Sequence, residues 1–179
     1  LTTSRMVNKL GKLFGAAVHE TPVGFKYIGP VMMKESASIA GEESGGYAFK
    51  GHIPERDGIL SALYFLDLMV KTGKTPSELL RYLYSKVGES YYDRIDIPFP
   101  PEKRQATVQR VSSAHPQTLA GLTIETVDTT DGFRFVLEDT SWVLIRFSGT
   151  EPLLRLYGES DTPARVASLL KAARELAGV

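Results

Sequence analysis

Hydrophobic residues in the first half of the chain recur at helical spacing in three segments. The first, from Met6 to Phe14, ends at Gly15, a residue suited to the left-handed conformation that closes helices. The second, residues 58–71, follows Asp57, a good N-cap, and is so apolar that we expect the helix to be largely buried. The third follows the capping box Thr75-Pro76-Ser77-Glu78 and stops at Gly88.

Short strand-like runs lie between the first two of these helices. Residues 16–20 and residues 38–40 have this character, and the segment between them opens with the turn residues Thr21-Pro22. A strand, a crossover and a second strand predict parallel pairing. Residues 1–92 are therefore expected to form an α/β domain with a mixed or parallel sheet and helices.

The second half has a different pattern, which predicts an α+β domain over residues 93–179. It opens with a strand-like run at residues 93–97 and the segment Pro98-Phe99-Pro100-Pro101, which excludes a helix. A helix over residues 102–113 and a last helix starting at Thr162-Pro163 enclose the strands. The strand runs are residues 122–127, 133–137, 142–147 and 153–157, with Asp131-Gly132 marking a hairpin. We expect an antiparallel four-stranded sheet with two helices.

Composition narrows the classes of function. The 179 residues carry 21 basic and 21 acidic side chains, so no net charge draws the chain to nucleic acid or a membrane surface. There is no cysteine, which excludes disulfides and thiolate metal sites, and the three histidines are too scattered for a zinc site. The longest apolar run, residues 59–70, is too short to span a membrane. We expect a cytoplasmic protein with neither nucleic acid nor membrane as partner and no metal ligands of its own.

Two loops carry residues suited to binding chemistry. Residues 41–46, Gly-Glu-Glu-Ser-Gly-Gly, place two carboxylates and a hydroxyl on a turn where carboxylates can accept hydrogen bonds from sugar hydroxyls. Residues 146–152, Arg-Phe-Ser-Gly-Thr-Glu-Pro, combine a guanidinium, two hydroxyls and a glycine N–H, the groups that hold a phosphate. Taken singly, either loop also fits an ordinary surface turn. His52, after the first loop, fits either a group that titrates near a substrate phosphate or a structural histidine.

The two loops, in this order, with Thr21-Pro22-Val23-Gly24-Phe25-Lys26 upstream and Arg56-Asp57-Gly58-Ile59 downstream of the first, resemble the α-D-phosphohexomutase family. Phosphoglucomutase and phosphomannomutase belong to this family. The resemblance covers essentially the whole chain and implies most of the third domain followed by the complete fourth. It implies sugar binding by Glu42, Ser44, Gly24, Lys26, His52 and Arg56, and phosphate binding by Arg146, Ser148, Gly149 and Thr150.

The same resemblance implies an enzyme that interconverts hexose 1-phosphate and hexose 6-phosphate through an enzyme phosphoserine and a bisphosphate. The family's Thr-Ala-Ser-His-Asn-Pro and Asp-x-Asp-x-Asp-Arg loops, which supply the phosphoserine and the Mg²⁺ ligands, do not occur in this sequence. We therefore expect no catalytic residue here and an inactive chain that binds hexose phosphate and glucose 1,6-bisphosphate beside missing N-terminal domains of the same polypeptide. The first residue, Leu1, fits a fragment.

Three alternatives differ in function. The doubled glutamate and paired glycines of residues 41–46 resemble glucose-type members more than glucosamine-type ones, and phosphomannomutase activity stays open. A free-standing, non-catalytic sugar-phosphate-binding module is a second alternative. A structural or interaction protein that retains both loops as relics is a third, in which an exposed apolar patch should replace the polar cleft between the domains.

Overall fold

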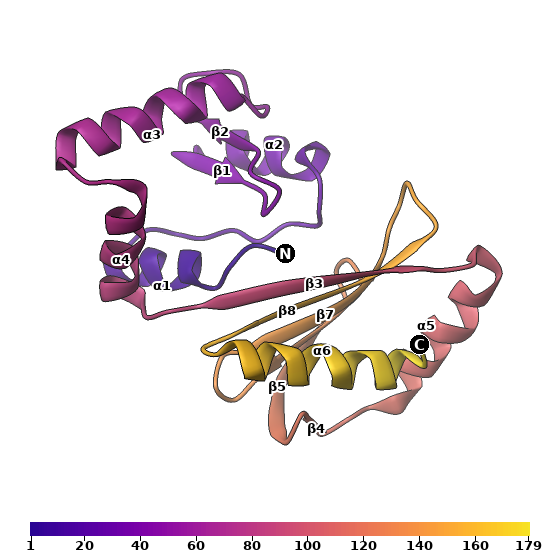
Figure 1. The fold of residues 1–179 in the computed structure, drawn as a ribbon. Coiled ribbons are helices and arrows are strands. Elements are labelled where there is room, and N and C mark those ends of the chain that lie inside the picture. Colours follow the sequence, from indigo (N-terminus) through magenta and orange to yellow (C-terminus); the bar gives the residue numbers. More distant parts are fainter. The chain divides into compact units, whose positions relative to one another are not determined.

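The computed structural model describes residues 1–179 and divides them into two compact units, residues 1–89 and residues 90–179 (Figure 1). The division falls between Glu89 and Ser90, three residues before the predicted boundary at 92/93. Strand β3 (Tyr91–Pro98) opens the second unit because it pairs along its whole length with that unit's strand β8 (Leu153–Ser160). None of the helices in either unit has the length and apolar composition needed to cross a membrane.

The first unit is mostly helical, and its local signals work as predicted. Its helices are α1 (Met6–Phe14), α2 (Phe25–Lys34), α3 (Gly58–Thr72) and α4 (Pro76–Val87). Helix α1 ends at Gly15 with φ 66°. The Asp57 carboxylate accepts a 2.9 Å hydrogen bond from the N–H of Leu60 and so caps α3. The predicted capping box of Thr75 and Glu78 is present at the start of α4.

The sheet of the first unit differs from the prediction. Strands β1 (Ile39–Gly41) and β2 (Tyr47–Phe49) form a two-stranded antiparallel ribbon. Residues 16–20 form no strand, so the predicted parallel pairing is wrong. The cause is local, because a five-residue turn returns the chain directly beside β1 and leaves its pairing to β2.

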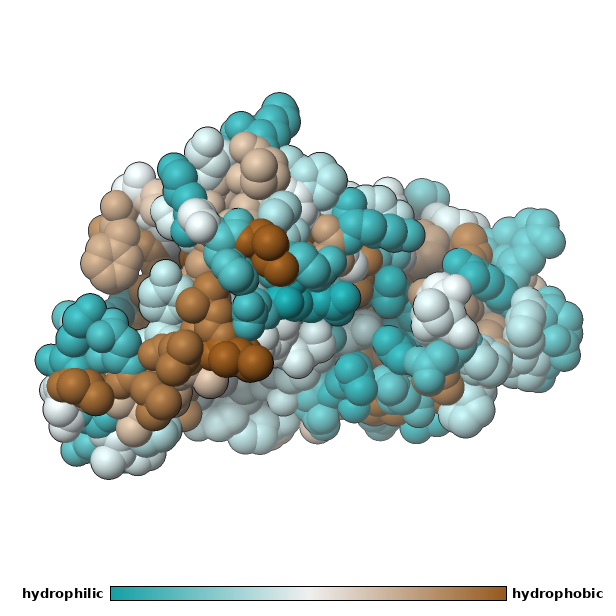
Figure 2. Space-filling model, turned by 90° about the horizontal axis from the view of Figure 1, so that it is seen from above, coloured by the Kyte–Doolittle hydropathy of each residue, from teal (hydrophilic) through white to brown (hydrophobic).

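The expectation that α3 is buried is also wrong. The buried core of this unit consists of Phe25, Ile28, Met32 and Ala48, and α3 contributes no buried residue. Figure 2 shows hydrophobic side chains gathered on the side of the molecule on which α3 lies. The large apolar residues that α3 exposes are Ile59, Leu63, Tyr64, Phe65, Leu66, Leu68 and Val70. The apolar composition of α3 indicates how much surface the helix could bury. The short two-stranded ribbon of this unit offers too little surface to cover the helix.

The second unit is built on one antiparallel sheet of six strands, not the predicted four. Its order is β3-β8-β7-β6-β5-β4. The remaining strands are β4 (Thr118–Leu119), β5 (Leu122–Asp128), β6 (Phe133–Leu137) and β7 (Trp142–Phe147). The strand-like run predicted at residues 93–97 is β3, but it was not counted in the sheet because its partner lies about sixty residues later in the chain. The prediction missed β4, which is only two residues long.

Two helices complete the second unit, as predicted. After the 3₁₀ turn η1 (Pro101–Lys103) comes α5 (Arg104–Ala114), and α6 (Pro163–Ala177) ends the chain. Helix α6 packs on β8, β7 and β3 and against α5, which buries one face of the sheet. The core residues are Phe99, Val111, Leu119, Phe135, Leu137, Val143, Ile145, Leu154, Leu156, Val166, Leu169, Leu170, Ala173 and Ala177. Side chains at alternate positions of β7 and β8 point to the opposite face of the sheet. Arg146 and Arg155 are two of them.

Candidate functional site

The predicted sugar loop is the turn that joins β1 to β2 in the first unit. The turn is closed by two backbone hydrogen bonds of 3.0 Å, from the N–H of Glu42 to the carbonyl of Gly46 and from the N–H of Gly45 to the carbonyl of Glu42. Gly45 adopts φ 89°, which favours glycine. Ser44 lies exposed at the tip of the turn. The loop therefore presents its polar groups from a fixed backbone.

Glu42 and Arg56 are brought together at the base of this turn. The Glu42 carboxylate is only 9% exposed, and its Oε2 lies 3.5 Å from Nη1 of Arg56. The Arg56 guanidinium lies 5.4 Å from the centre of the Phe25 ring, at the start of α2. A Cβ atom on Gly46 would lie 2.4 Å from Cδ of Arg56, so glycine at that position lets the arginine lie across the turn. One buried carboxylate is thus oriented by one arginine.

His52 and Asp57 form a second pair beside the same ribbon. His52 Nε2 and Asp57 Oδ2 are 2.9 Å apart, while the other carboxylate oxygen of Asp57 caps α3. The N–H of Leu60 first, and then the His52 ring, hold the pKa of the Asp57 carboxyl below its usual range. The N–H of Asp57 also donates to the carbonyl of Tyr47 in β2. This carboxylate was predicted only as a helix cap, and the structure gives it a second role in orienting the imidazole.

The other predicted sugar residues are less closely joined. Gly24 is the N-cap of α2 and has φ 123°, while Lys26 is exposed with its Nζ 4.8 Å from the centre of the Tyr27 ring.

The structure also reveals a contact that the sequence did not suggest. The buried hydroxyl of Thr2 donates a 2.9 Å hydrogen bond to Glu43 Oε2, which ties the loop to the start of the chain.

The predicted phosphate loop joins β7 to β8 in the second unit. Ser148 is buried, and its Oγ accepts hydrogen bonds from the N–H groups of Thr150 (3.4 Å) and Glu151 (3.2 Å). The loop is anchored further by the N–H of Phe99, which donates to the carbonyl of Pro152 at 2.8 Å. Gly149 and Thr150 are exposed, and open space surrounds the position of a Cβ on Gly149. The serine therefore shapes the loop, while Gly149 and Thr150 after it are exposed to solvent.

Arg146 lies on β7 just before this loop and has an unpredicted partner. Its Nε donates a 2.9 Å hydrogen bond to Oδ2 of Asp131, in the connection between β5 and β6. The Arg146 side chain is only 12% exposed. The sequence marked Asp131 solely as a turn residue, and no local pattern indicated that its turn would lie beside Arg146, fifteen residues later.

A second arginine lies beside Arg146 on the same face of the sheet. Arg155 of β8 is directly opposite Arg146 in the register and forms ion pairs with Asp96 and Glu151. Partial burial opposes its charge, but Tyr157, Asp96 and Glu151 outweigh that effect and raise the pKa of the guanidinium. Two carboxylates thus neutralise Arg155. Asp131, in contrast, accepts a hydrogen bond from Nε of Arg146, so the two terminal nitrogens of Arg146 can donate to another acceptor.

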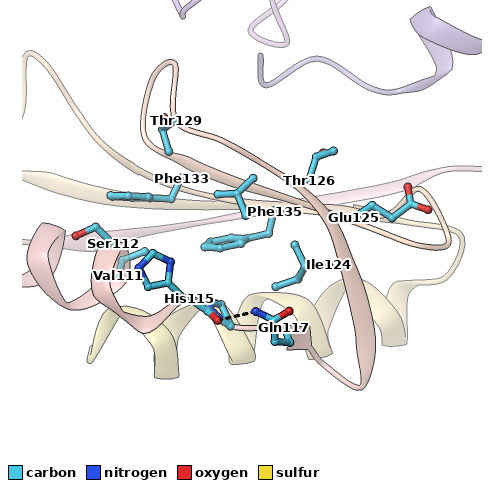
Figure 3. Close-up of a pocket in the computed structure, with 12 residues that line it drawn as sticks. Val111, Ser112, His115, Gln117, Ile124, Glu125, Thr126, Thr129, Phe133 and Phe135 are labelled. Atoms are coloured by element: carbon cyan, nitrogen blue, oxygen red, sulfur yellow. Dashed lines mark hydrogen bonds between the residues drawn. The ribbon is translucent and has the colours of Figure 1, made fainter.

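Two cavities, one in each unit, have no residue of the predicted phosphate loop on their lining. One, of about 410 Å³, lies between α5 and strands β5 and β6, with Val111, Ile124 and Phe135 on its walls and His115 and Gln117 among its polar groups (Figure 3). The other, of about 470 Å³, lies in the first unit and is mostly apolar. Glu42 is the predicted sugar residue on its lining.

No group of three or more His, Asp or Glu side chains in residues 1–179 is placed to hold a metal ion.

Comparison with known proteins identifies the class to which this fold and these loops belong. Residues 1–87 match the model of the phosphoglucomutase/phosphomannomutase alpha/beta/alpha domain III, and residues 100–176 match that of the phosphoglucomutase/phosphomannomutase C-terminal domain. The chain belongs to the phosphoglucomutase/phosphomannomutase family, as its two loops predicted.

Named relatives extend this assignment. A phosphoglucomutase/phosphomannomutase of Thermococcus kodakarensis is 30% identical over 171 residues, which cover 96% of this chain and 35% of the relative. Phosphoglucomutase 1 of Drosophila melanogaster is 30% identical over 187 residues, covering 89% of this chain and 33% of the relative. The chain thus spans about a third of the length of these relatives.

Solved structures give the same result. The crystal structure of a putative phosphomannomutase from Thermus thermophilus matches all of this chain and 35% of its own with a TM-score of 0.79 and 36% identity. The open form of the phosphoglucomutase parafusin from Paramecium matches 99% of this chain and 36% of its own with a TM-score of 0.81 and 25% identity.

Proposed function

We propose that this chain is the substrate-binding C-terminal portion of a phosphohexose mutase that interconverts hexose 1-phosphate and hexose 6-phosphate. The observation that carries the proposal is Arg146, a mostly buried guanidinium held through Nε beside a loop in which Gly149 and Thr150 are exposed. Such a fork is suited to bidentate hydrogen bonds with a phosphate. Family membership over both units supports the same function.

Each loop has its own task in this proposal. Arg146, Gly149 and Thr150 hold the phosphate that does not react, and Ser148 keeps the loop in shape while its hydroxyl hydrogen is free to donate. Glu42 and Ser44 accept hydrogen bonds from the sugar hydroxyls, with Arg56 fixing the carboxylate. Gly24, Lys26 and His52 complete the sugar side. Phosphoryl transfer depends mainly on positioning and charge stabilisation, so these contacts decide which substrate oxygen is presented for reaction.

The reaction itself requires groups that this chain does not supply. In the proposed cycle a phosphoserine elsewhere in the polypeptide transfers its phosphoryl group to the hexose phosphate. The resulting bisphosphate, glucose 1,6-bisphosphate for a glucose enzyme, reorients and returns a phosphoryl group to the serine. Mg²⁺ would be bound in other domains, and a cytoplasmic location fits such a substrate. Glucose is the proposed hexose because of the loop sequence, with mannose as the alternative.

Calorimetric titration of this chain with glucose 1-phosphate tests the binding role. We expect Arg146→Ala to weaken binding by about 1.5–3 kcal/mol, the range for a hydrogen bond to a charged group. Unchanged affinity would remove Arg146 from the site.

A mutase assay on the same preparation, with glucose 1,6-bisphosphate and magnesium, should show no turnover. Turnover would contradict the assignment of catalytic groups to other domains.

A further inference from the structure

We propose that Asp131 is a positioning residue for phosphate recognition, acting through Arg146. This inference rests on the proposed function, because it assigns the partner that orients the arginine of that site. It begins from the 2.9 Å hydrogen bond between Arg146 Nε and Asp131 Oδ2. Hydrogen bonding at Nε restricts rotation about the end of the side chain and leaves the end of the guanidinium, formed by the two terminal nitrogens, available to a second acceptor.

The turn that carries Asp131 is held by main-chain contacts. A Cβ on Gly132, which has φ 107°, would lie 2.5 Å from the carbonyl oxygen of Ile145 and 3.2 Å from Cα of Arg146. The backbone of the turn therefore lies directly against β7 at the residues that precede the phosphate loop. Figure 3 shows Thr129 on this connection and Phe133 on the strand that leaves it.

Two further contacts stiffen the same connection. The N–H of Thr130 donates a 2.9 Å hydrogen bond to Oδ1 of Asp128, and Phe133 is directly opposite Ile145 in the register of β6 and β7. Asp131 is thus placed by its backbone and not by adjustment of a flexible side chain. Because the Arg146 side chain is mostly buried, the carboxylate restricts the guanidinium to one orientation before any ligand arrives.

Positioning and simple charge have opposite consequences at this residue. A carboxylate beside an arginine lowers the positive potential of the site, so removal of Asp131 should strengthen the binding of any anion if charge alone mattered. If Asp131 orients the guanidinium, its removal should weaken binding although the site becomes more positive. The sign of the change therefore separates the two roles.

The test is titration of the chain with glucose 1-phosphate for four variants. We expect Asp131→Ala to weaken binding about ten-fold, and Asp131→Asn, which keeps an acceptor for Nε, to stay within about three-fold of wild type. Asp131→Glu keeps the charge but moves the carboxylate, and should bind more weakly than Asp131→Asn. Asp139→Ala is the matched control, because it removes the same charge from the neighbouring β6–β7 turn, where the carboxylate lies near Arg165. It should bind as wild type does.

A second readout is independent of the ligand. The Nε–H resonance of Arg146 in ¹⁵N-edited NMR should be protected from exchange in wild type and Asp131→Asn and lost in Asp131→Ala.

Binding by Asp131→Ala equal to or tighter than wild type would overturn the inference, as would Asp131→Glu binding as wild type does. If wild type fails to bind, or Arg146→Ala binds equally well, the proposed function fails and the inference with it. If Arg146→Ala weakens binding but Asp131→Ala does not, only the positioning role fails.

Discussion

The two candidate loops are both connections between antiparallel strands, but they lie on unequal scaffolds. The phosphate loop joins two central strands of a six-stranded sheet whose one face is filled by a continuous core. The sugar loop joins a ribbon of two three-residue strands beside a core of four buried residues. In the first unit side-chain pairs hold the functional groups, chiefly Glu42 with Arg56 and His52 with Asp57.

Under the proposed function, this difference would suit the two loops to two different ligands. A phosphate has a fixed shape and charge, so a rigid guanidinium and loop can be complementary to it before binding. Sugar hydroxyls differ among hexoses only in orientation, and carboxylates held by neighbouring side chains discriminate among them by hydrogen-bond geometry.

The largest effect should come from the core of the second unit. Leu156 of β8 is fully buried between sheet and helix, so Leu156→Ala should lower the free energy of unfolding by about 2–5 kcal/mol. The single tryptophan, Trp142 of β7, is also fully buried, and its fluorescence reports this unit during urea unfolding.

Leu66→Ala is the matched control in the first unit. Leu66 is 55% exposed on α3, so its truncation should change stability by no more than about 0.5 kcal/mol. Far-UV circular dichroism follows this change. Equal losses for the two leucines would contradict the contrast between the scaffolds.

The next prediction separates the two loops by ligand. Glu42→Gln should weaken glucose 1-phosphate about ten-fold, because the amide loses the charge-assisted hydrogen bonds to the sugar, but should leave inorganic phosphate unaffected. Arg146→Ala should weaken both ligands. Calorimetric titration with glucose 1-phosphate, mannose 1-phosphate and inorganic phosphate makes the comparison. Equal losses for all three ligands in Glu42→Gln would remove its role in sugar recognition.

Whether a feature of the fold or of the site could be predicted from the sequence depends on how far apart along the chain its interacting residues lie. Caps and turns are local, so Asp57, the Thr75 capping box and Gly15 gave correct helix ends. The two loops could be chosen as candidates because their residues are consecutive. Non-local features escaped, including the pairing of β3 with β8. The Asp131–Arg146 contact depends on the packing of one hairpin turn against a strand, which no short pattern encodes.

A smaller effect is expected at the N-terminus of α6. The Thr162 hydroxyl accepts a 3.3 Å hydrogen bond from the N–H of Arg165 and caps the helix that covers the sheet. Thr162→Ala should lower the free energy of unfolding by about 1 kcal/mol in the Trp142 fluorescence assay. Thr162→Ser keeps the hydroxyl and should restore most of the loss. A serine variant as unstable as the alanine variant would show that the methyl group, not the cap, matters.

The smallest effect should disappear in acid and again concerns the turn beside Arg146. Burial acts to raise the pKa of Asp128, but the hydroxyl and N–H of Thr130 and the charge of Arg134 outweigh it and hold the pKa below its usual range. A carboxyl with a lowered folded-state pKa stabilises the fold above its unfolded value of about 3.9 and loses that contribution as the pH falls through the folded-state pKa. Asp128→Asn should therefore be less stable than wild type at neutral pH, and the difference should shrink in acid. Urea unfolding followed by Trp142 fluorescence, at neutral pH and then stepwise below about pH 4, measures the difference. A difference in the free energy of unfolding that stays constant as the pH falls would mean that ionisation of Asp128 does not stabilise the turn. The rigidity of the turn beside Arg146 would then depend on its main-chain contacts.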